Sequence, residues 1–164
     1  VIMAGAEKVS LNSQAVKNPR LIQEGAWAFG SQAIVLGMDA LKDPAMPSGY
    51  RVVINGGRTP TDKDALAWAL EAQKLGAGEI VLNSIDADGT KEGYELTITR
   101  LIGEAVDIPV VASGGAGRPE HLVAVLREGK ADAALVASMV HFGTYTVGGI
   151  KQALAAAGVP VRLD

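Results

Sequence analysis

The chain has 164 residues, of which 48% are hydrophobic. Its 15 basic and 18 acidic residues give a net charge of −3 without a basic block, which excludes the basic surface typical of a nucleic-acid binder. It contains no cysteine, which excludes disulfides, thiolate metal ligands and cysteine nucleophiles. No apolar run is long enough to span a bilayer and no signal peptide is evident, so we expect a cytoplasmic globular protein with one core and neither a nucleic-acid nor a membrane partner.

The first residues have the character of a last helical turn. Residues 1–4 do not begin with methionine, and Gly5 stands where glycine commonly ends a helix. We therefore expect the chain to begin partway through a larger architecture.

Three segments share one pattern: GAEKVSLNS (5–13), GAGEIVLNS (76–84) and GKADAALVAS (129–138). Each begins with a helix-ending glycine, passes a charged residue and continues as an apolar strand that ends on serine. Two more apolar runs, 33–40 and 108–115, lie between them. The runs are continuous rather than alternating, which is typical of parallel strands buried on both faces. The sequence therefore predicts five βα units.

The segments between these strands have a helical period. Between 59 and 76, Thr61 is expected to cap a helix together with Asp64 three residues later, and Gly76 is expected to end it. The predicted buried stripe of this helix comprises Ala65, Trp68, Ala69, Ala72 and Leu75.

A second helix is expected over 118–129, where Pro119 suits the first turn and Gly129 the end. Residues 41–58 are an exception, because proline, serine and glycine bracket a short apolar run. We expect a loop there that carries one extra strand over 50–55.

Repeated βα units form either an open doubly wound sheet or part of a (βα)8 barrel. A rim rich in Gly, Ser, Asn and Asp recurs after nearly every strand, which favours the barrel, because a doubly wound sheet concentrates its ligands at one switch point. The expected fold class is α/β, with 1–164 as a single partial (βα)8-barrel domain. Five units do not close a barrel, so we expect the two open sheet edges to be covered by another chain or by self-association.

A phosphate-binding loop is the main functional prediction. Ser113, Gly114 and Gly115 lie on a strand-to-helix turn, where bare backbone lets N–H groups approach an anion. The alternative is that these glycines only allow a tight turn. The neighbouring strands end on Asp88-Gly89 and on Ala137-Ser138, and loops after the last strands of such barrels often hold phosphate, which favours the functional interpretation.

Two further pairs, Asn12-Ser13 and Asn83-Ser84, end strands two units apart. Asn12 and Ser13 could contact a second phosphate across the rim, although Asn and Ser also simply cap strand ends. Asp39 follows six largely apolar residues at the end of a strand, where partial burial suits a carboxylate to acid–base catalysis; a helix cap or a rim ion pair is the alternative.

Lys8 and Glu79 precede their strands, at the opposite end of the barrel, where charges usually form stabilising ion pairs. His121 is expected to be solvated on a first helical turn. His141 lies nearer the phosphate rim, but one histidine without a second ligand makes neither a metal site nor a triad.

Several of these motifs resemble one family. EKVSLNS, GMDA, GAGEIVLNSIDADGTKEGY, VVASGGAG, ALVASMVHFG and VPVRLD are similar to the cyclase subunits of imidazole glycerol phosphate synthase, in histidine biosynthesis. The likeness covers all 164 residues and corresponds to the fourth to eighth strands of that (βα)8 barrel. The sister isomerase of the pathway shares the SGG and DGT loops, but KEGY and VHFG resemble the cyclase more.

The resemblance implies an enzyme that takes ammonia from a glutaminase subunit docked at the barrel bottom. It would use that ammonia to convert a bis-phosphorylated ribulosyl-formimino aminoimidazole carboxamide ribotide into imidazole glycerol phosphate and AICAR, without a metal or organic cofactor. Asp39 matches an acid–base aspartate, and Lys8 and Glu79 match charges of the ammonia gate. The candidate phosphate and substrate residues are Asn12, Ser13, Ser84, Asp88, Gly89, Ser113, Gly114, Gly115, Ala137 and Ser138.

The first three strands of the family barrel, with its second catalytic aspartate, have no counterpart in these 164 residues. We therefore expect this polypeptide alone to bind phosphate weakly and to turn over negligibly. Two alternatives stay open: a self-associating, non-catalytic phosphate-binding module, and the sister isomerase.

Overall fold

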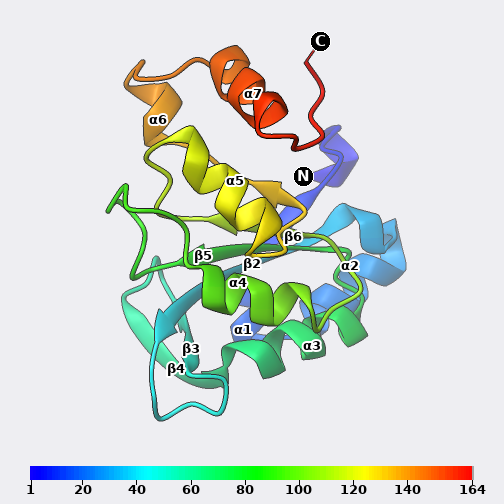
Figure 1. The fold of residues 1–164 in the computed structure, drawn as a ribbon. Helices are drawn as coiled ribbons and strands as arrows, with labels where there is room; N and C mark the ends of the chain where they lie inside the picture. The colour runs from blue at the N-terminus through cyan, green and yellow to red at the C-terminus, as the bar shows by residue number, and fades with distance from the viewer. Residues whose placement is uncertain (164) are drawn as a thin grey trace.

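The structure is a computed structural model that describes residues 1–163. A seven-stranded sheet, in the order β4-β3-β2-β5-β6-β7 with β1 also paired to β2, carries a layer of helices (Figure 1). The elements before the fifth strand are η1 (Ile2–Ala4), β1 (Val9–Leu11), α1 (Ser13–Lys17), α2 (Arg20–Phe29), η2 (Ser31–Ala33), β2 (Ile34–Lys42), β3 (Tyr50–Ile54), β4 (Thr59–Asp64) and α3 (Ala65–Leu75). The others are β5 (Glu79–Ser84), α4 (Leu96–Gly103), β6 (Val110–Ser113), α5 (Pro119–Arg127), β7 (Ala133–Ala134), α6 (Ser138–His141) and α7 (Val147–Ala156).

The parallel part of the sheet has the expected architecture. Strands β1, β2, β5, β6 and β7 pair in parallel, in chain order. Helices α1 to α5 contact one another in the same order, which is the arrangement of repeated βα units. The predicted α/β class with a parallel-dominated sheet is confirmed, and it is consistent with a TIM-barrel-like fold.

The two faces of the sheet differ in burial. Along β5, buried residues alternate with half-buried ones, and Ile80 and Leu82 belong to the core shared with the helices. Because side chains alternate across a strand, the half-buried set, which includes Val81 and Asn83, lies on the opposite face. In a barrel closed from such units this second face would line the interior, and it carries the candidate catalytic residue described below.

Helix boundaries follow glycine and proline as predicted. Gly76 ends α3 with a left-handed φ of 107°, and Pro119 begins α5. The predicted cap was wrong: the N-cap of α3 is Asp64, whose carboxylate accepts the Ala67 N–H at 3.0 Å. The Thr61 hydroxyl instead donates to the Val52 carbonyl at 2.7 Å, because Thr61 belongs to β4.

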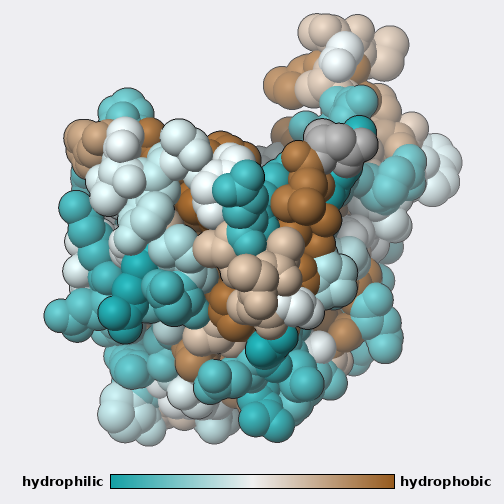
Figure 2. All heavy atoms as spheres, turned by 45° about the horizontal axis from the view of Figure 1, so that its top comes forward, coloured by the Kyte–Doolittle hydropathy of each residue, from teal (hydrophilic) through white to brown (hydrophobic). Residues whose placement is uncertain are grey.

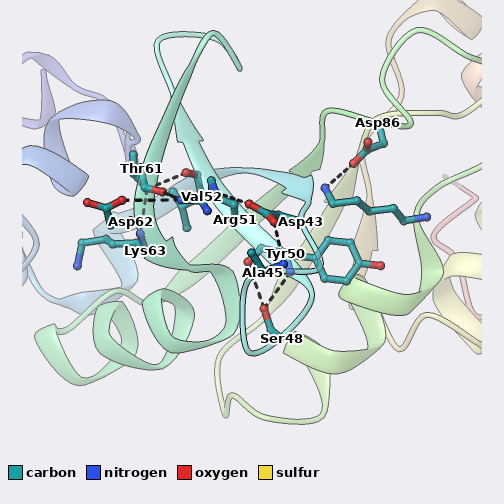
Figure 3. Close-up of polar contacts among 11 residues, drawn as sticks. Asp43, Ala45, Ser48, Tyr50, Arg51, Val52, Thr61, Asp62, Lys63 and Asp86 are labelled. Carbon is teal, nitrogen blue, oxygen red and sulfur yellow. Dashed lines mark hydrogen bonds and ion pairs between the residues drawn. The ribbon is translucent and has the colours of Figure 1, made fainter.

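The extra strand expected over 50–55, within the loop 41–58, is confirmed as β3, but it forms a hairpin with β4, a strand that was not predicted. Strand β3 pairs antiparallel with both β2 and β4, and this pairing extends β2 to Lys42, beyond the predicted end at Asp39. Arg51 fixes the hairpin: its Nε donates to Asp43 at 2.6 Å, and its guanidinium also contacts the Thr61 carbonyl and lies 3.9 Å from Asp62 (Figure 3).

The parallel sheet has an unpaired edge beside an apolar groove. Strand β7 pairs only with β6 among the described strands. A groove of about 490 Å³ runs beside it between α5 and α7, lined by side chains such as Leu122, Ile150 and Leu154. Figure 2 shows hydrophobic side chains in a band surrounded by polar ones on the face it presents.

Within residues 1–163, no helix is both long and apolar enough to cross a bilayer.

Candidate active site

Three residues on neighbouring strands form a row near the carboxyl ends of these strands. Asp39 on β2 is in register with Asn83 on β5, and Asn83 is in register with Ser113 on β6. Residues in register on parallel strands point to the same face, and strands lie about 4.8 Å apart, so Asp39 is roughly 10 Å from Ser113 at the backbone. The row therefore connects the candidate acid–base residue with the candidate phosphate loop.

Asp39 is held by two side-chain amides. Asn12 Nδ2 donates to one carboxylate oxygen at 3.2 Å, and Asn83 Nδ2 donates to the other at 3.3 Å. The side chain is 8% exposed, and none of the ion pairs among residues 1–163 includes it. A carboxylate that is oriented by neutral amides and free of a cation keeps lone pairs with which to accept a proton.

The Asn12 amide also offers an unused acceptor. Its Oδ1 is buried and has no hydrogen-bond partner within residues 1–163. The amide cannot be turned over to relieve this, because the carbonyl oxygen would then face the Asp39 carboxylate. A buried acceptor without a donor is costly, so this atom is an unsatisfied polar position next to Asp39.

A cavity of about 140 Å³ lies between the loops that follow β5, β6 and β7. It brings together seven of the predicted phosphate and substrate residues, and it adds three that were not predicted. The predicted residues are Asp88, Gly89, Ser113, Gly114, Gly115, Ala137 and Ser138, and the additional ones are Lys91, Ala116 and Leu135.

The glycines of the β6–α5 loop allow another loop to pack against them. A Cβ on Gly115 would lie 2.0 Å from the Gly93 carbonyl oxygen, and one on Gly117 would lie 2.1 Å from the Lys91 carbonyl oxygen. Gly93 N–H also donates to Gly115 O at 2.8 Å, which ties the two loops together. The tight-turn alternative is therefore incomplete, because these glycines also build the wall of the cavity.

The same loop presents backbone donors. Among residues 1–163, no intramolecular hydrogen bond engages the N–H groups of Gly114, Gly115 or Ala116. Gly114 and Gly115 have φ values of 87° and 102°, a left-handed conformation that favours glycine. Successive free N–H groups at a cavity are suited to an oxyanion.

Three of the ten predicted phosphate and substrate residues lie outside this cavity, and one of them is Asn12, which contacts Asp39. Ser84 is buried on the side of the sheet that faces the helices, and its hydroxyl accepts the Ala87 N–H at 3.3 Å. It therefore does not line the cavity. Ser13 Oγ accepts the Asn55 N–H at 2.9 Å, which places it against the tip of the β3–β4 hairpin. The residue of the Asn83-Ser84 pair that faces the site is Asn83, which the prediction omitted.

The remaining charged candidates have structural contacts. Lys8 Nζ and Glu79 Oε2 form an ion pair of 2.5 Å; Lys8 precedes β1 and Glu79 is the first residue of β5, so the pair lies at the end of the sheet opposite to Asp39. Asp86, another carboxylate close to a strand end, accepts the Lys42 N–H at 2.8 Å (Figure 3). No group of three His, Asp or Glu side chains within residues 1–163 is arranged to hold a metal ion.

His121 is not simply solvated, contrary to expectation. Its Nδ1 lies 3.1 Å from Gly117 N, and its Nε2 lies 3.0 Å from Arg118 Nε, so the ring supports the β6–α5 loop. A neutral imidazole accepts at only one nitrogen, so one of these contacts forms at a time. Burial, together with the Arg118 charge, lowers the pKa of His121, while Glu120 opposes the shift.

This contact predicts a pH-dependent stability. In the folded protein the pKa of His121 is below its unfolded value of 6.5. The contribution of His121 to the free energy of unfolding is therefore complete above pH 6.5 and is lost as the pH falls through the folded-state pKa. We expect denaturant unfolding to give wild type a higher free energy of unfolding than His121→Gln at pH 7.5. This difference should shrink by about 1 kcal/mol between pH 7.5 and 5, because one hydrogen bond is lost. Parallel pH profiles for the two proteins would contradict this.

The chain is similar to known proteins over nearly its whole length. A family model described as "Histidine biosynthesis protein" matches residues 1–146. The chain is 66% identical to the imidazole glycerol phosphate synthase subunit HisF of Desulforapulum autotrophicum, over 99% of the chain and 64% of that relative. Proteins of the same name from Syntrophobacter fumaroxidans and Desulfatibacillum aliphaticivorans are 65% and 64% identical, with the same coverage. The chain thus spans about 64% of the length of these relatives.

Proposed function

The chain belongs to the histidine biosynthesis protein family, and from this premise we propose that it supplies an acid–base residue and a phosphate site of an imidazole glycerol phosphate synthase. The substrate would be the bis-phosphorylated ribulosyl-formimino aminoimidazole carboxamide ribotide. Ammonia closes the imidazole ring, and the products are imidazole glycerol phosphate and AICAR. A biosynthetic role of this kind also favours the cytoplasm as the location.

The observation that carries this proposal is the row from Asp39 through Asn83 to Ser113. It joins a carboxylate that is oriented by two amides to a cavity with free backbone N–H donors. A substrate whose phosphate occupies the cavity would extend along the row and bring its reacting atoms to Asp39. The Asn12 Oδ1 acceptor then lies beside the reacting part of the substrate.

Asp39 is proposed to move a proton during ring closure, whereas the phosphate contacts hold the substrate in place. Positioned acid–base groups typically contribute about 10²- to 10⁴-fold in rate. The family resemblance assigns a second aspartate to the strands that precede this portion of the barrel. We therefore propose that turnover requires both parts of the barrel.

The opposite end of the sheet is the proposed entry for ammonia. Lys8 and Glu79 form their ion pair there, and the resemblance assigns such charges to a gate beneath a docked glutaminase subunit. An exposed ion pair contributes only about 0–1 kcal/mol to stability, so its loss should leave the fold intact and reveal a role in ammonia transfer.

A complementation assay tests the proposal. Turnover of the bis-phosphate with ammonia is expected to be undetectable for this chain alone. It should rise by at least about 100-fold when the three preceding βα units of a close relative are added, because a second acid–base group is supplied. Equal rates with and without the added units would contradict the dependence.

The same samples separate the alternatives. Turnover of the isomerase substrate instead of the bis-phosphate would identify the sister isomerase. A stable homodimer that binds phosphate and stays inactive after complementation would identify the non-catalytic module. The synthase name of the reported relatives favours the first proposal.

A further inference from the structure

The cavity lining includes a basic residue that the motifs did not identify. Lys91 lines it together with Gly89, Gly114 and Ser138, and it is the only basic residue among the described residues of the lining. Asp88, on the same loop, also lines the cavity. An anion in this cavity would therefore lie near one acidic and one basic residue, and it would need the basic one.

The backbone of Lys91 is fixed in place. Its φ is 62°, a left-handed conformation that glycine would adopt at lower cost, and its carbonyl packs directly against Gly117. The Gly93–Gly115 hydrogen bond closes the loop on the other side. The backbone of Lys91 is therefore packed against the β6–α5 loop, at the wall of the cavity.

The ammonium group has a weak partner outside the cavity. Lys91 Nζ lies 5.9 Å from the centroid of the Phe142 ring, which is 73% exposed. None of the ion pairs among residues 1–163 includes Lys91. An exposed cation–π contact is weaker than a charge-assisted hydrogen bond to an oxyanion, so a phosphate can displace the ring.

We propose that Lys91 is the cationic ligand of the phosphate group in this cavity, and that Phe142 competes with phosphate for its ammonium group. This inference rests on the proposed phosphate site. According to this proposal, the Lys91 side chain adds to the phosphate affinity that the backbone N–H donors provide. The competition by Phe142 makes the affinity lower than the cavity would otherwise allow.

Titration with inorganic phosphate, followed by NMR, tests the proposal on four variants of the chain. Lys91→Met keeps the length of the side chain and its backbone strain but removes the charge, and we expect about tenfold weaker binding. Lys91→Arg, as the matched control, should stay within about threefold of wild type because it keeps the charge. Phe142→Leu should bind about two- to fivefold tighter, the equivalent of an exposed cation–π contact.

The double variant isolates the competition. Lys91→Met with Phe142→Leu should bind like Lys91→Met alone, because Phe142 acts only through Lys91. The affinity of Lys91→Met should also respond less to added salt than that of wild type, since an ionic contact has been removed. Unchanged unfolding midpoints would show that the loop is intact.

Each contrary outcome has a distinct meaning. Wild-type binding with an unchanged affinity for Lys91→Met would overturn the role of Lys91 and leave the cavity as a phosphate site. A full effect of Lys91→Met without any gain for Phe142→Leu would overturn the competition. Failure of the wild-type chain to bind phosphate would remove the proposed phosphate site, and this inference with it.

Discussion

Replacing Asp39 by asparagine is expected to lower the ammonia-dependent turnover of the complemented enzyme by about 10²- to 10⁴-fold. The asparagine keeps the size of the carboxylate and its place beside the Asn12 and Asn83 amides, but it cannot take up a proton. Steady-state turnover of the bis-phosphate at saturating ammonia measures the effect. The loss should appear in kcat, because the proposed phosphate contacts do not involve Asp39.

The matched control is Asp86→Asn. Asp86 is a carboxylate of the next strand end, but it is engaged by the Lys42 backbone N–H, so its replacement should change kcat by less than about tenfold. Phosphate affinity, measured by the same titration as above, should be equal for wild type and Asp39→Asn. A complemented Asp39→Asn enzyme with wild-type kcat would overturn the acid–base assignment, and equal losses for both variants would point to a general electrostatic effect.

The parallel strands and most helix ends could be predicted from the sequence because their signals are local. Continuous apolar runs indicated strands buried on both faces, and Gly76 and Pro119 marked helix boundaries through their own backbone preferences. Strand β4 had no such signal. Its sequence, TPTDKD, is polar and contains Pro60, which an edge strand tolerates because its outer N–H positions need no partner.

The error at the α3 cap has the same origin. Thr61 and Asp64 both have capping side chains, and spacing alone favoured a cap at Thr61. The pairing of β3 with β4 holds Thr61 in extended backbone, so the helix begins only at Ala65. A tertiary contact decided between two positions that were equivalent by local propensity.

The site was predictable at the level of loops but not of individual side chains. The motifs identified the strand ends that form the cavity. They did not distinguish Asn83 from Ser84, because this choice depends on which of two successive residues faces the interior. The register with Asp39 and Ser113 makes that choice, and a count of alternation along the β5 run could have found it. The place of Lys91 in the cavity depends on contacts between separate loops, for which a single sequence carries no signal. The contact of His121 with Gly117 is local, only four residues apart, but it depends on the conformation of the β6–α5 loop.

The second large effect is expected from Gly115→Ala, because the alanine methyl group would meet two obstacles. The residue has a φ of 102°, which costs an L-residue about 1–2 kcal/mol. Its Cβ would also lie 2.0 Å from the Gly93 carbonyl oxygen, and relieving an overpacked contact of this kind costs about 1–3 kcal/mol more. We therefore expect denaturant unfolding to show a loss of about 2–5 kcal/mol in the free energy of unfolding.

Gly143→Ala separates the two causes. Gly143 also has a left-handed φ, 70°, but apart from its own neighbours in the chain, no atom of the described residues lies within 4 Å of the position of an added Cβ. Its replacement should cost only the conformational part, about 1–2 kcal/mol, and leave phosphate affinity unchanged. Because the Gly93–Gly115 contact holds the cavity wall, Gly115→Ala should weaken phosphate binding as well. Equal stability losses in the two variants would mean that the loops are not packed as tightly as this structure shows. An unchanged phosphate affinity for Gly115→Ala would mean that the packing of the two loops does not affect binding of the anion.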